Sequence, residues 1–272
     1  MRQLRALVKA TLNEGLSLLG LRVRRLPRPL AFNPHALLRI DLPMVVSHHL
    51  ASRKQRAFFF VQIGAFDGRS GDPLHQLVVA NRWEGVLVEP QRDAFMRLQE
   101  TYRSQPQLRL RNVAVGPRTE RRQLFRIAAK RPGLPEWSTQ VASFQLETIR
   151  AHRREIPDID ELIEATEIEC QTFDDLLPPP MPRHLDLLQI DAEGFDDEIL
   201  RLFHASGRTA SIVAFEHKHL SRLRLEACFA DLIARGYQLA LDGPDTVGYR
   251  AEGMTSAPDT DNENRRSTRS RP

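Results

Sequence analysis

The sequence has little cysteine and no long hydrophobic run, and both absences narrow what the chain can be. Its 272 residues include only two cysteines, Cys170 and Cys228, which are far apart and in no metal-binding spacing. We therefore expect reduced thiols and no disulfide framework. No segment has the unbroken apolar length of a membrane-spanning helix, and none resembles a signal peptide. We accordingly expect a cytoplasmic protein.

Positive charge is also scarce outside the first residues, although the net charge of the chain is +4. Residues 1–30 carry seven Lys or Arg against Glu14 alone, whereas residues 31–250 carry 28 basic and 30 acidic residues. The main part of the chain therefore lacks the basic surface that nucleic acid requires, and we predict no nucleic-acid partner. Residues 251–272 are polar, with balanced charge, and are expected to be disordered.

The basic segment 1–30 alternates apolar and basic residues at helical spacing. One interpretation is an interfacial helix that contacts an anionic membrane peripherally, at its inner face. The other is a helix that packs on the domain or is flexible. The sequence leaves both open, and it does not predict an oligomeric state.

Residues 31–250 alternate strand and helix patterns. Strands are expected at 58–63, 85–89, 108–115, 122–127, 166–171, 185–191, 211–216, 237–241 and about 246–250. Helices are expected at 72–81, with Asp72 as N-cap and Pro73 as first residue, and at 92–103, 144–154, 172–177, 196–203 and 223–235. The pattern predicts a Rossmann-like α/β fold: a mostly parallel, seven-stranded, twisted sheet with helices on both faces and a closing antiparallel hairpin. Such a hairpin is more typical of a methyltransferase sheet than of two βαβαβ dehydrogenase halves.

The turn after the first long strand, GAFDG at 64–68, carries the clearest chemical signal. Its spacing is GxxxG, and Phe66 occupies the second glycine position of the dinucleotide motif GxGxxG. Asp67 adds a negative charge that would repel a pyrophosphate but attract the sulfonium and amino groups of S-adenosylmethionine. Glu89 ends the next strand, where a carboxylate can accept hydrogen bonds from ribose hydroxyls. The alternatives are an ordinary βα turn and a helix-capping acid before Pro90.

Six segments together resemble the FkbM-type methyltransferases: VQIGAFDG (61–68), GVLVEP (85–90), NVAVG (112–116), QTFDDLL (171–177), LLQIDAEGFD (187–196) and FEHKHL (215–220). They occur in the family's order, and IDAEG at 190–194 is the most specific. The resemblance covers roughly residues 55–250. It implies a Rossmann-like fold, S-adenosylmethionine as the methyl donor, and methyl transfer to oxygen, often on sugars or other secondary metabolites.

The resemblance also implies roles for individual residues. Gly64, Asp67 and Gly68 would face the methionine end of the cofactor, Glu89 the ribose, Asn112 and Ala114 the adenine, and Asp191 the transferred methyl group. Two positions depart from the family pattern. Many members carry an acid where this chain has Gln62, and a lysine where it has Gln189. Both changes keep hydrogen bonding but lose charge.

A hydroxyl acceptor must lose its proton during methyl transfer, which requires a general base at the carboxyl ends of the strands. We predict Asp191 as this base and His217, with an ordinary pKa of about 6.5, as the second choice. His217 as a positioning or capping residue and Glu193 as a structural cap are the alternatives. The set Asp191, Glu193, Glu216, His217 and His219 also offers metal-ligand chemistry, but its spacing is no known ligand pattern, and we predict no metal.

The sequence therefore predicts an S-adenosylmethionine-dependent O-methyltransferase with a small-molecule or glycan acceptor, and places residues 116–170 on the substrate side. A non-catalytic methyltransferase-like scaffold in glycan assembly stays open because of Gln62 and Gln189. An NAD(P)-dependent oxidoreductase is disfavoured by Phe66, Asp67, the closing hairpin and the absence of a Tyr-x-x-x-Lys pair. The signatures of nucleic-acid amino and pyrimidine methyltransferases are also absent.

Overall fold

The computed structural model describes residues 37–52, 57–128 and 131–251. The predictions for the basic segment 1–30 and for nearly all of the polar tail 251–272 lie outside these residues. Within the described ranges, no helix has the length and apolar character needed to cross a membrane. Cys170 and Cys228 are both buried free thiols.

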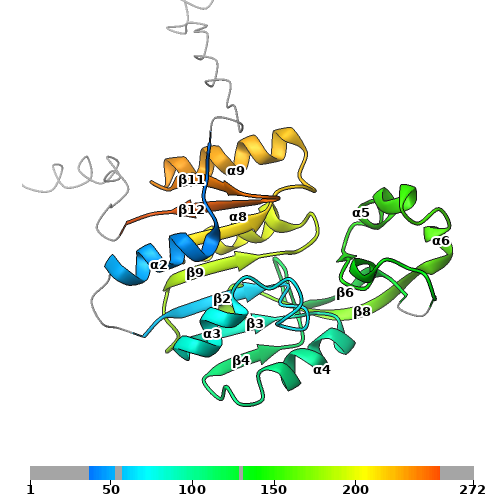
Figure 1. Ribbon diagram of the computed structural model, residues 1–272, viewed down its shortest axis with the longest axis horizontal. Coiled ribbons are helices and arrows are strands. Elements are labelled where there is room, and N and C mark those ends of the chain that lie inside the picture. Colours follow the sequence, from blue (N-terminus) through cyan, green and yellow to red (C-terminus); the bar gives the residue numbers. More distant parts are fainter. Residues whose placement is uncertain (1–36, 53–56, 129–130, 252–272) are drawn as a thin grey trace, which may run out of the picture. The chain divides into compact units, whose positions relative to one another are not determined.

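The large sheet has eight strands in the order β1-β11-β12-β10-β9-β2-β3-β4 (Figure 1). Their bounds are β1 (Leu38–Arg39), β2 (Phe59–Ile63), β3 (Glu84–Val88), β4 (Leu108–Arg111), β9 (His184–Ile190), β10 (Thr209–Glu216), β11 (Gln238–Asp242) and β12 (Asp245–Tyr249). Only β12 runs antiparallel to its neighbours in this sheet. The α/β class and the closing hairpin are confirmed. The count of seven strands is wrong, because the short β1 pairs in parallel with β11 at the edge.

The sheet order reverses between β2 and β9, because β3 and β4 extend one way and β10 to β12 the other. Ligands in open α/β sheets bind at the carboxyl ends of the strands at such a reversal. The register pairs Ile63 of β2 with Ile190 of β9. The glycine turn and Asp191, which follow these two residues, therefore lie side by side.

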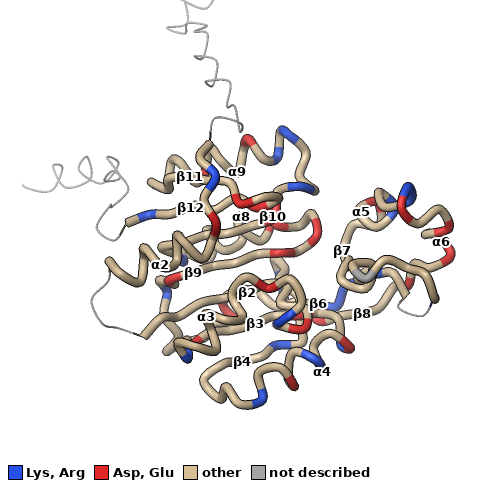
Figure 2. The backbone as a smooth tube through the Cα atoms, viewed as in Figure 1, with Lys and Arg blue, Asp and Glu red and all other residues tan. Residues whose placement is uncertain are grey.

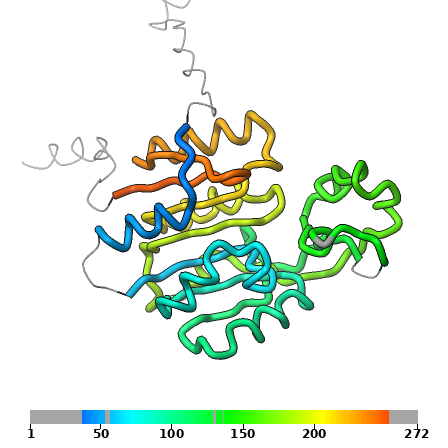
Figure 3. The backbone as a smooth tube through the Cα atoms, in the orientation of Figure 1, coloured from blue at the N-terminus to red at the C-terminus, as the bar shows by residue number. Residues whose placement is uncertain are grey.

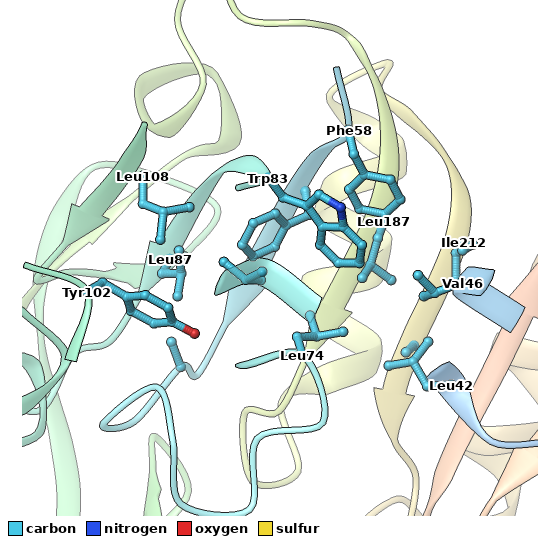
Figure 4. Close-up of a cluster of buried hydrophobic side chains, with 14 of the residues drawn as sticks. Leu42, Val46, Phe58, Leu74, Trp83, Leu87, Tyr102, Leu108, Leu187 and Ile212 are labelled. Carbon is cyan, nitrogen blue, oxygen red and sulfur yellow. The ribbon is translucent and has the colours of Figure 1, made fainter. Parts of the chain in front are cut away.

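Helices α2 (Leu42–Ser52), α3 (His75–Asn81) and α4 (Arg92–Thr101) pack on one face of this sheet. Figure 4 shows Leu42 and Val46 of α2 beside Ile212 of β10 in a buried hydrophobic cluster. Phe58 and Trp83 stack in the same cluster with ring centroids 3.9 Å apart. Alternate strand residues, such as Leu188 and Val213, are buried on the opposite face. There α8 (Asp196–Ala205) contacts β9, β10 and α9 (Arg222–Ala234). Helices on both faces are thus confirmed.

Several helix predictions differ from the structure. The helix predicted at 144–154 is instead a short α-helix, Leu146–Arg150, followed by a 3-10 turn, Ala151–Arg154. No helix was expected at 42–52, where α2 lies. The helix predicted from Asp72 begins instead at His75. The Asp72 carboxylate accepts a hydrogen bond from the Leu74 backbone N–H at 2.8 Å, so it caps the turn that precedes the helix. By contrast, Thr172 does cap α7 (Phe173–Leu176), because its hydroxyl accepts the N–H of Asp175.

Residues between β4 and β9 form a second, four-stranded sheet in the order β5-β8-β6-β7 (green in Figure 3). Its elements are β5 (Ala114–Val115), β6 (Glu120–Ile127), the 3-10 turn η2 (Glu136–Thr139), β7 (Ala142–Ser143), α5 (Leu146–Arg150), the 3-10 turn η3 (Ala151–Arg154), α6 (Ile159–Leu162) and β8 (Ile163–Gln171). Long β6 and β8 are antiparallel over eight residue pairs. The single strand predicted at 108–115 is wrong, because β4 and β5 belong to different sheets.

Candidate active site

A pocket lies at the carboxyl ends of β2, β3 and β9, where the sheet order reverses. One wall comes from the glycine turn, one from the loop after β9, and one from the second sheet. That last wall includes Leu124, Gln140, Ala142, Ser143 and Phe144. The segment predicted on the substrate side therefore contributes directly to the pocket.

The two glycines of the turn are required for different reasons. Gly64 has a φ of +81°, and a Cβ there would lie 1.8 Å from the carbonyl oxygen of Asp191. Only glycine allows the ends of β2 and β9 to approach this closely beside the pocket. Gly68, with φ +70°, packs under the ring of Tyr102 and the side chain of Leu98 on α4. Gly64 lines the pocket, whereas Gly68 stabilises the turn from behind.

Asp67 fixes the shape of the turn with its side chain. Its carboxylate accepts hydrogen bonds from the backbone N–H groups of Arg69 at 3.0 Å and Ser70 at 2.7 Å, and from the Ser70 hydroxyl at 2.7 Å. Partial burial acts to raise the pKa of Asp67, but these hydrogen bonds outweigh it and hold the pKa below its ordinary value. Asp67 is not among the lining residues, whereas Ser70, which it holds, is.

Glu89 connects the turn to the start of α4. Its side chain accepts the backbone N–H of Phe66 at 2.9 Å and that of Gln91 at 2.7 Å, one on each oxygen. The residue is only 3% exposed, and burial raises its pKa to about 7. Glu89 thus caps the chain before α4, and it also lines the pocket.

Asn112 and Ala114 occupy different positions in the structure. The Asn112 side-chain amide donates to the carbonyl oxygens of Glu89 at 2.8 Å and Pro90 at 3.1 Å. Asn112 follows β4, where the chain leaves the large sheet. It therefore holds the residues that follow β3 against the residues that follow β4. Ala114 lines the pocket, and Asn112 does not.

Asp191 follows β9 and lines the pocket, and its backbone N–H donates to the carbonyl oxygen of Ile63 at 2.9 Å. Surrounding protein limits its hydration, and the negative charges of Glu193 and Glu216 repel it. Both effects raise the pKa of Asp191 above its ordinary value, but the residue is exposed to solvent in the pocket, and this hydration limits how far the pKa rises.

The loop after Asp191 adopts an unusual backbone that buried Asp196 stabilises. Glu193 and Gly194 have φ values of +47° and +89°. The Asp196 carboxylate accepts the N–H groups of Ala192 at 3.2 Å and Gly194 at 3.1 Å. Burial raises the pKa of Asp196 to about 8. A non-glycine residue at positive φ costs about 1–3 kcal/mol, and such strain often occurs at functional sites.

His217 lies apart from this pocket. Its Nδ1 is 3.1 Å from the hydroxyl oxygen of Thr246 on β12, and its backbone N–H donates to Pro244. Burial lowers its pKa below the ordinary histidine value. The structure therefore does not bring the two predicted bases together: Asp191 lines the pocket, and His217 does not.

Two pocket features were not predicted as such. Gln62 and Gln189 are register partners on β2 and β9, and both line the pocket. In the described part of the protein, the Oε1 atom of each is buried without a hydrogen-bond partner. Ser143 and Phe144 come from the second sheet, and no local sequence signal places them at this site.

Comparisons with known proteins place this architecture in a family. A family model described as methyltransferase FkbM domain matches residues 62–230, more than half of the chain. No curated protein matches.

Similar solved structures include the methyltransferase FkbM from Methylobacillus flagellatus KT, at 17% identity with a TM-score of 0.44 over 80% of this chain and 49% of that one. This chain therefore spans about half the length of that protein. The N-terminal domain of human METTL16 in complex with SAH is 12% identical, with a TM-score of 0.40 over 89% and 81% of the two chains. Precorrin-6y C5,15-methyltransferase from Geobacter metallireducens GS-15 is 11% identical, with a TM-score of 0.37 over 81% and 95%.

Proposed function

The chain belongs to the FkbM methyltransferase family, and from that premise we propose that it transfers a methyl group from S-adenosylmethionine to a hydroxyl oxygen of a small molecule. The proposed acceptor is a sugar, a glycan or another secondary metabolite. The observation that carries the proposal is Asp191, a carboxylate that opens into a pocket beside a glycine turn. No cation of the described chain forms an ion pair with this carboxylate.

The pocket residues fit S-adenosylmethionine in three respects. Gln62 and Gln189 present two buried oxygens without partners, which suit the ammonium group of an amino acid. Gly64 lets the ends of β2 and β9 approach closely, so backbone rather than a side chain lines this part of the pocket. Each Glu89 oxygen accepts one backbone N–H and keeps a further lone pair for a ribose hydroxyl. When bound, the cofactor supplies a methyl group on a positively charged sulfur.

We propose that Gly64, Asp67 and Gly68 shape the methionine end of this site. Asp67 acts through Ser70, whose position it fixes. Ala114 would contact the adenine, and Asn112 would hold the Glu89 segment against it through two carbonyls. The preformed turn reduces the motion needed to position the reacting groups, and such positioning supplies much of the rate in a displacement reaction.

Asp191 is the proposed general base. Its raised pKa makes it a better proton acceptor than an ordinary aspartate, and its position lets it reach an acceptor hydroxyl in the pocket. His217 remains the second candidate, but the Thr246 hydroxyl lies on one of its ring nitrogens. The wall formed by Ser143 and Phe144 would contact the acceptor.

Calorimetric titration of S-adenosylhomocysteine, NAD and NADP tests the cofactor. We expect S-adenosylhomocysteine alone to bind, at micromolar affinity, and Glu89→Ala to weaken it at least tenfold. Glu84→Ala, an exposed acid on the same strand, serves as the matched control and should bind normally. Asp191→Asn should keep cofactor binding but lose methyl transfer in an acceptor screen that begins with sugars.

Each negative result has a distinct meaning. If none of the three ligands binds, the result favours the non-catalytic scaffold and refutes the catalytic assignments. If NAD or NADP binds instead, the proposed donor is wrong. Full turnover by Asp191→Asn would remove Asp191 as the base while leaving the donor assignment intact.

A further inference from the structure

Three side chains converge next to the pocket, and their closest polar atoms make no hydrogen bond of good geometry with one another. Glu193 lies in the loop after β9, Glu216 ends β10, and His219 follows β10. One ligand atom from each lies within 4.8 Å of the other two. His219 Nε2 is 2.9 Å from Glu193 Oε2 and 3.4 Å from Glu216 Oε2. Figure 2 shows acidic positions on the loops at these strand ends.

All three atoms are buried, and none has a hydrogen bond of acceptable geometry within the described residues. An N–H on His219 Nε2 would point at neither nearby oxygen, despite the short distances. The side chain of Glu216 is only 8% exposed. A buried carboxylate oxygen without a partner is costly, so lone pairs that converge on one point need a cation between them.

We propose that Glu193, Glu216 and His219 bind a divalent first-row metal ion such as Mn²⁺ or Zn²⁺. Metal–ligand distances of about 2.1 Å place ligand atoms about 3.0 Å apart in octahedral and about 3.4 Å apart in tetrahedral geometry. The two separations from His219 Nε2 are of this size. An imidazole beside two carboxylates favours manganese, iron or zinc over magnesium and calcium, which prefer oxygen ligands.

The charges around the cluster favour a cation. The carboxyl groups of Asp191, Asp196 and Asp245 lie close enough to interact electrostatically with Glu216, and each one that ionises favours a cation there. The only cation that pairs with the cluster within the described residues is Lys218, whose Nζ is 2.6 Å from Glu216 Oε1. That contact uses the other oxygen and leaves Oε2 free. Lys218 is half exposed, so it can move into solvent when a metal ion binds.

A competing explanation needs no metal. Protonated His219 and Lys218 together would neutralise Glu193 and Glu216. The two explanations differ in whether the wild type binds metal. In a metal site the wild type binds an ion, and loss of Lys218 tightens binding by removing a repelling charge. In an ion-pair cluster the wild type binds none.

Glu193 lines the pocket as well as the cluster, so the ion would lie at the edge of the pocket. Its role there rests on the proposed function: a cation at this position would hold an acceptor hydroxyl and lower its pKa. Binding of the metal itself does not depend on that role.

The test is titration of the full chain, stripped with EDTA, with MnCl₂ and ZnCl₂, followed by calorimetry and by the electron paramagnetic resonance of free Mn²⁺. We expect one ion per chain. Glu216→Gln and His219→Gln should each weaken binding at least tenfold, and Lys218→Met should tighten it severalfold. Glu198→Gln and His48→Gln, which alter an acid on α8 and an exposed histidine on α2, are the matched controls and should bind normally.

Absence of saturable binding at millimolar metal, or equal affinity in the wild type and all variants, would overturn the proposal. Circular dichroism verifies that each variant is folded. If Glu216→Gln or His219→Gln does not fold, the expected tightening in Lys218→Met still tests the proposal. S-adenosylhomocysteine binding is measured on the same samples. Cofactor binding without metal binding overturns only this inference, and metal binding without cofactor binding overturns only the proposed function.

Discussion

Replacing Glu89 with glutamine should change how the stability of the ligand-free protein depends on pH. Burial raises the pKa of Glu89 from 4.5 to about 7. The folded state therefore holds this proton more tightly than the unfolded state does. The free energy of unfolding contributed by this group is highest below about pH 4.5 and falls as the pH rises to about 7. A shift of this size corresponds to about 3 kcal/mol.

Glutamine does not ionise, but it has only one acceptor oxygen, so its NH₂ group would face one of the two backbone N–H groups that Glu89 accepts. The variant should therefore be less stable than the wild type near pH 4.5, by about 1–3 kcal/mol for the lost hydrogen bond. Above pH 7 the wild type must hold a buried charge and the variant need not. We expect the stability difference to move in favour of Glu89→Gln by up to about 3 kcal/mol as the pH rises from about 4.5 to above 7, and the variant to bind S-adenosylhomocysteine more weakly because a ribose acceptor is lost.

Urea unfolding of both proteins at pH 5, 6, 7 and 8 measures this difference directly. Other buried carboxyls, such as Asp196, also make the wild type pH-dependent, so the informative quantity is the gap between wild type and variant. Glu84→Gln, at the exposed start of β3, should track the wild type at every pH. A gap that stays constant with pH, or that moves in favour of the wild type as the pH rises, would refute the reasoning. It would mean that the two backbone N–H groups stabilise the carboxylate more than burial destabilises it.

Two further predictions concern the turn and its support. Gly64→Ala should destabilise the protein by several kcal/mol or prevent folding, because the new Cβ would collide with backbone atoms. The control is Gly243→Ala, which also has positive φ but has nothing within 4 Å of its Cβ, and it should cost about 1 kcal/mol in chemical unfolding. Asn112→Ala should lower the free energy of unfolding by about 1–3 kcal/mol, because two hydrogen bonds to the residues after β3 are lost, and it should weaken S-adenosylhomocysteine binding. The control is Asn81→Ala, which removes an exposed hydrogen bond on α3 and should change neither stability nor binding by much.

Much of the large sheet was predictable because its signals are local. The apolar runs of β2, β9 and β10 begin and end within two residues of the predicted bounds, and so do most of the helices that follow them. Helix α2 was missed because its sequence, LPMVVSHHLAS, has no acid in the first turn and no clear polar face. Its helical state depends on burial of Leu42 and Val46 against the sheet, which no local pattern records.

The second sheet was not predictable because its pairing is distant in sequence. Residues of β6 pair with residues of β8 some 36 to 50 positions further along the chain. The break between β4 and β5 depends on Asn112, whose amide binds the end of β3 rather than a sequence neighbour. The wall containing Ser143 and Phe144 follows from that pairing, so its place in the pocket could not be derived from the sequence.

Local patterns placed Gly64, Glu89 and Asp191 at strand ends, and the structure brings all three to one pocket. The direction of a side chain after a strand is harder to predict, because it depends on where the pleat ends. For this reason His217 was grouped with Asp191 although it faces Thr246 on β12. The paired oxygens of Gln62 and Gln189 likewise appear only when the register of β2 with β9 is known.

The groups that form the pocket are also the groups that hold its backbone. Glu89 fixes the glycine turn and Asp196 fixes the loop after β9, and burial raises the pKa of each. A protein that needed only stability would gain from neutral residues at these positions, because a buried charge without a counterion is unfavourable. Their presence makes sense if a ligand with positive charge and hydrogen-bond donors binds in the pocket near them and returns that free energy on binding. Ligand-free instability and cofactor affinity would then have the same origin in these carboxylates.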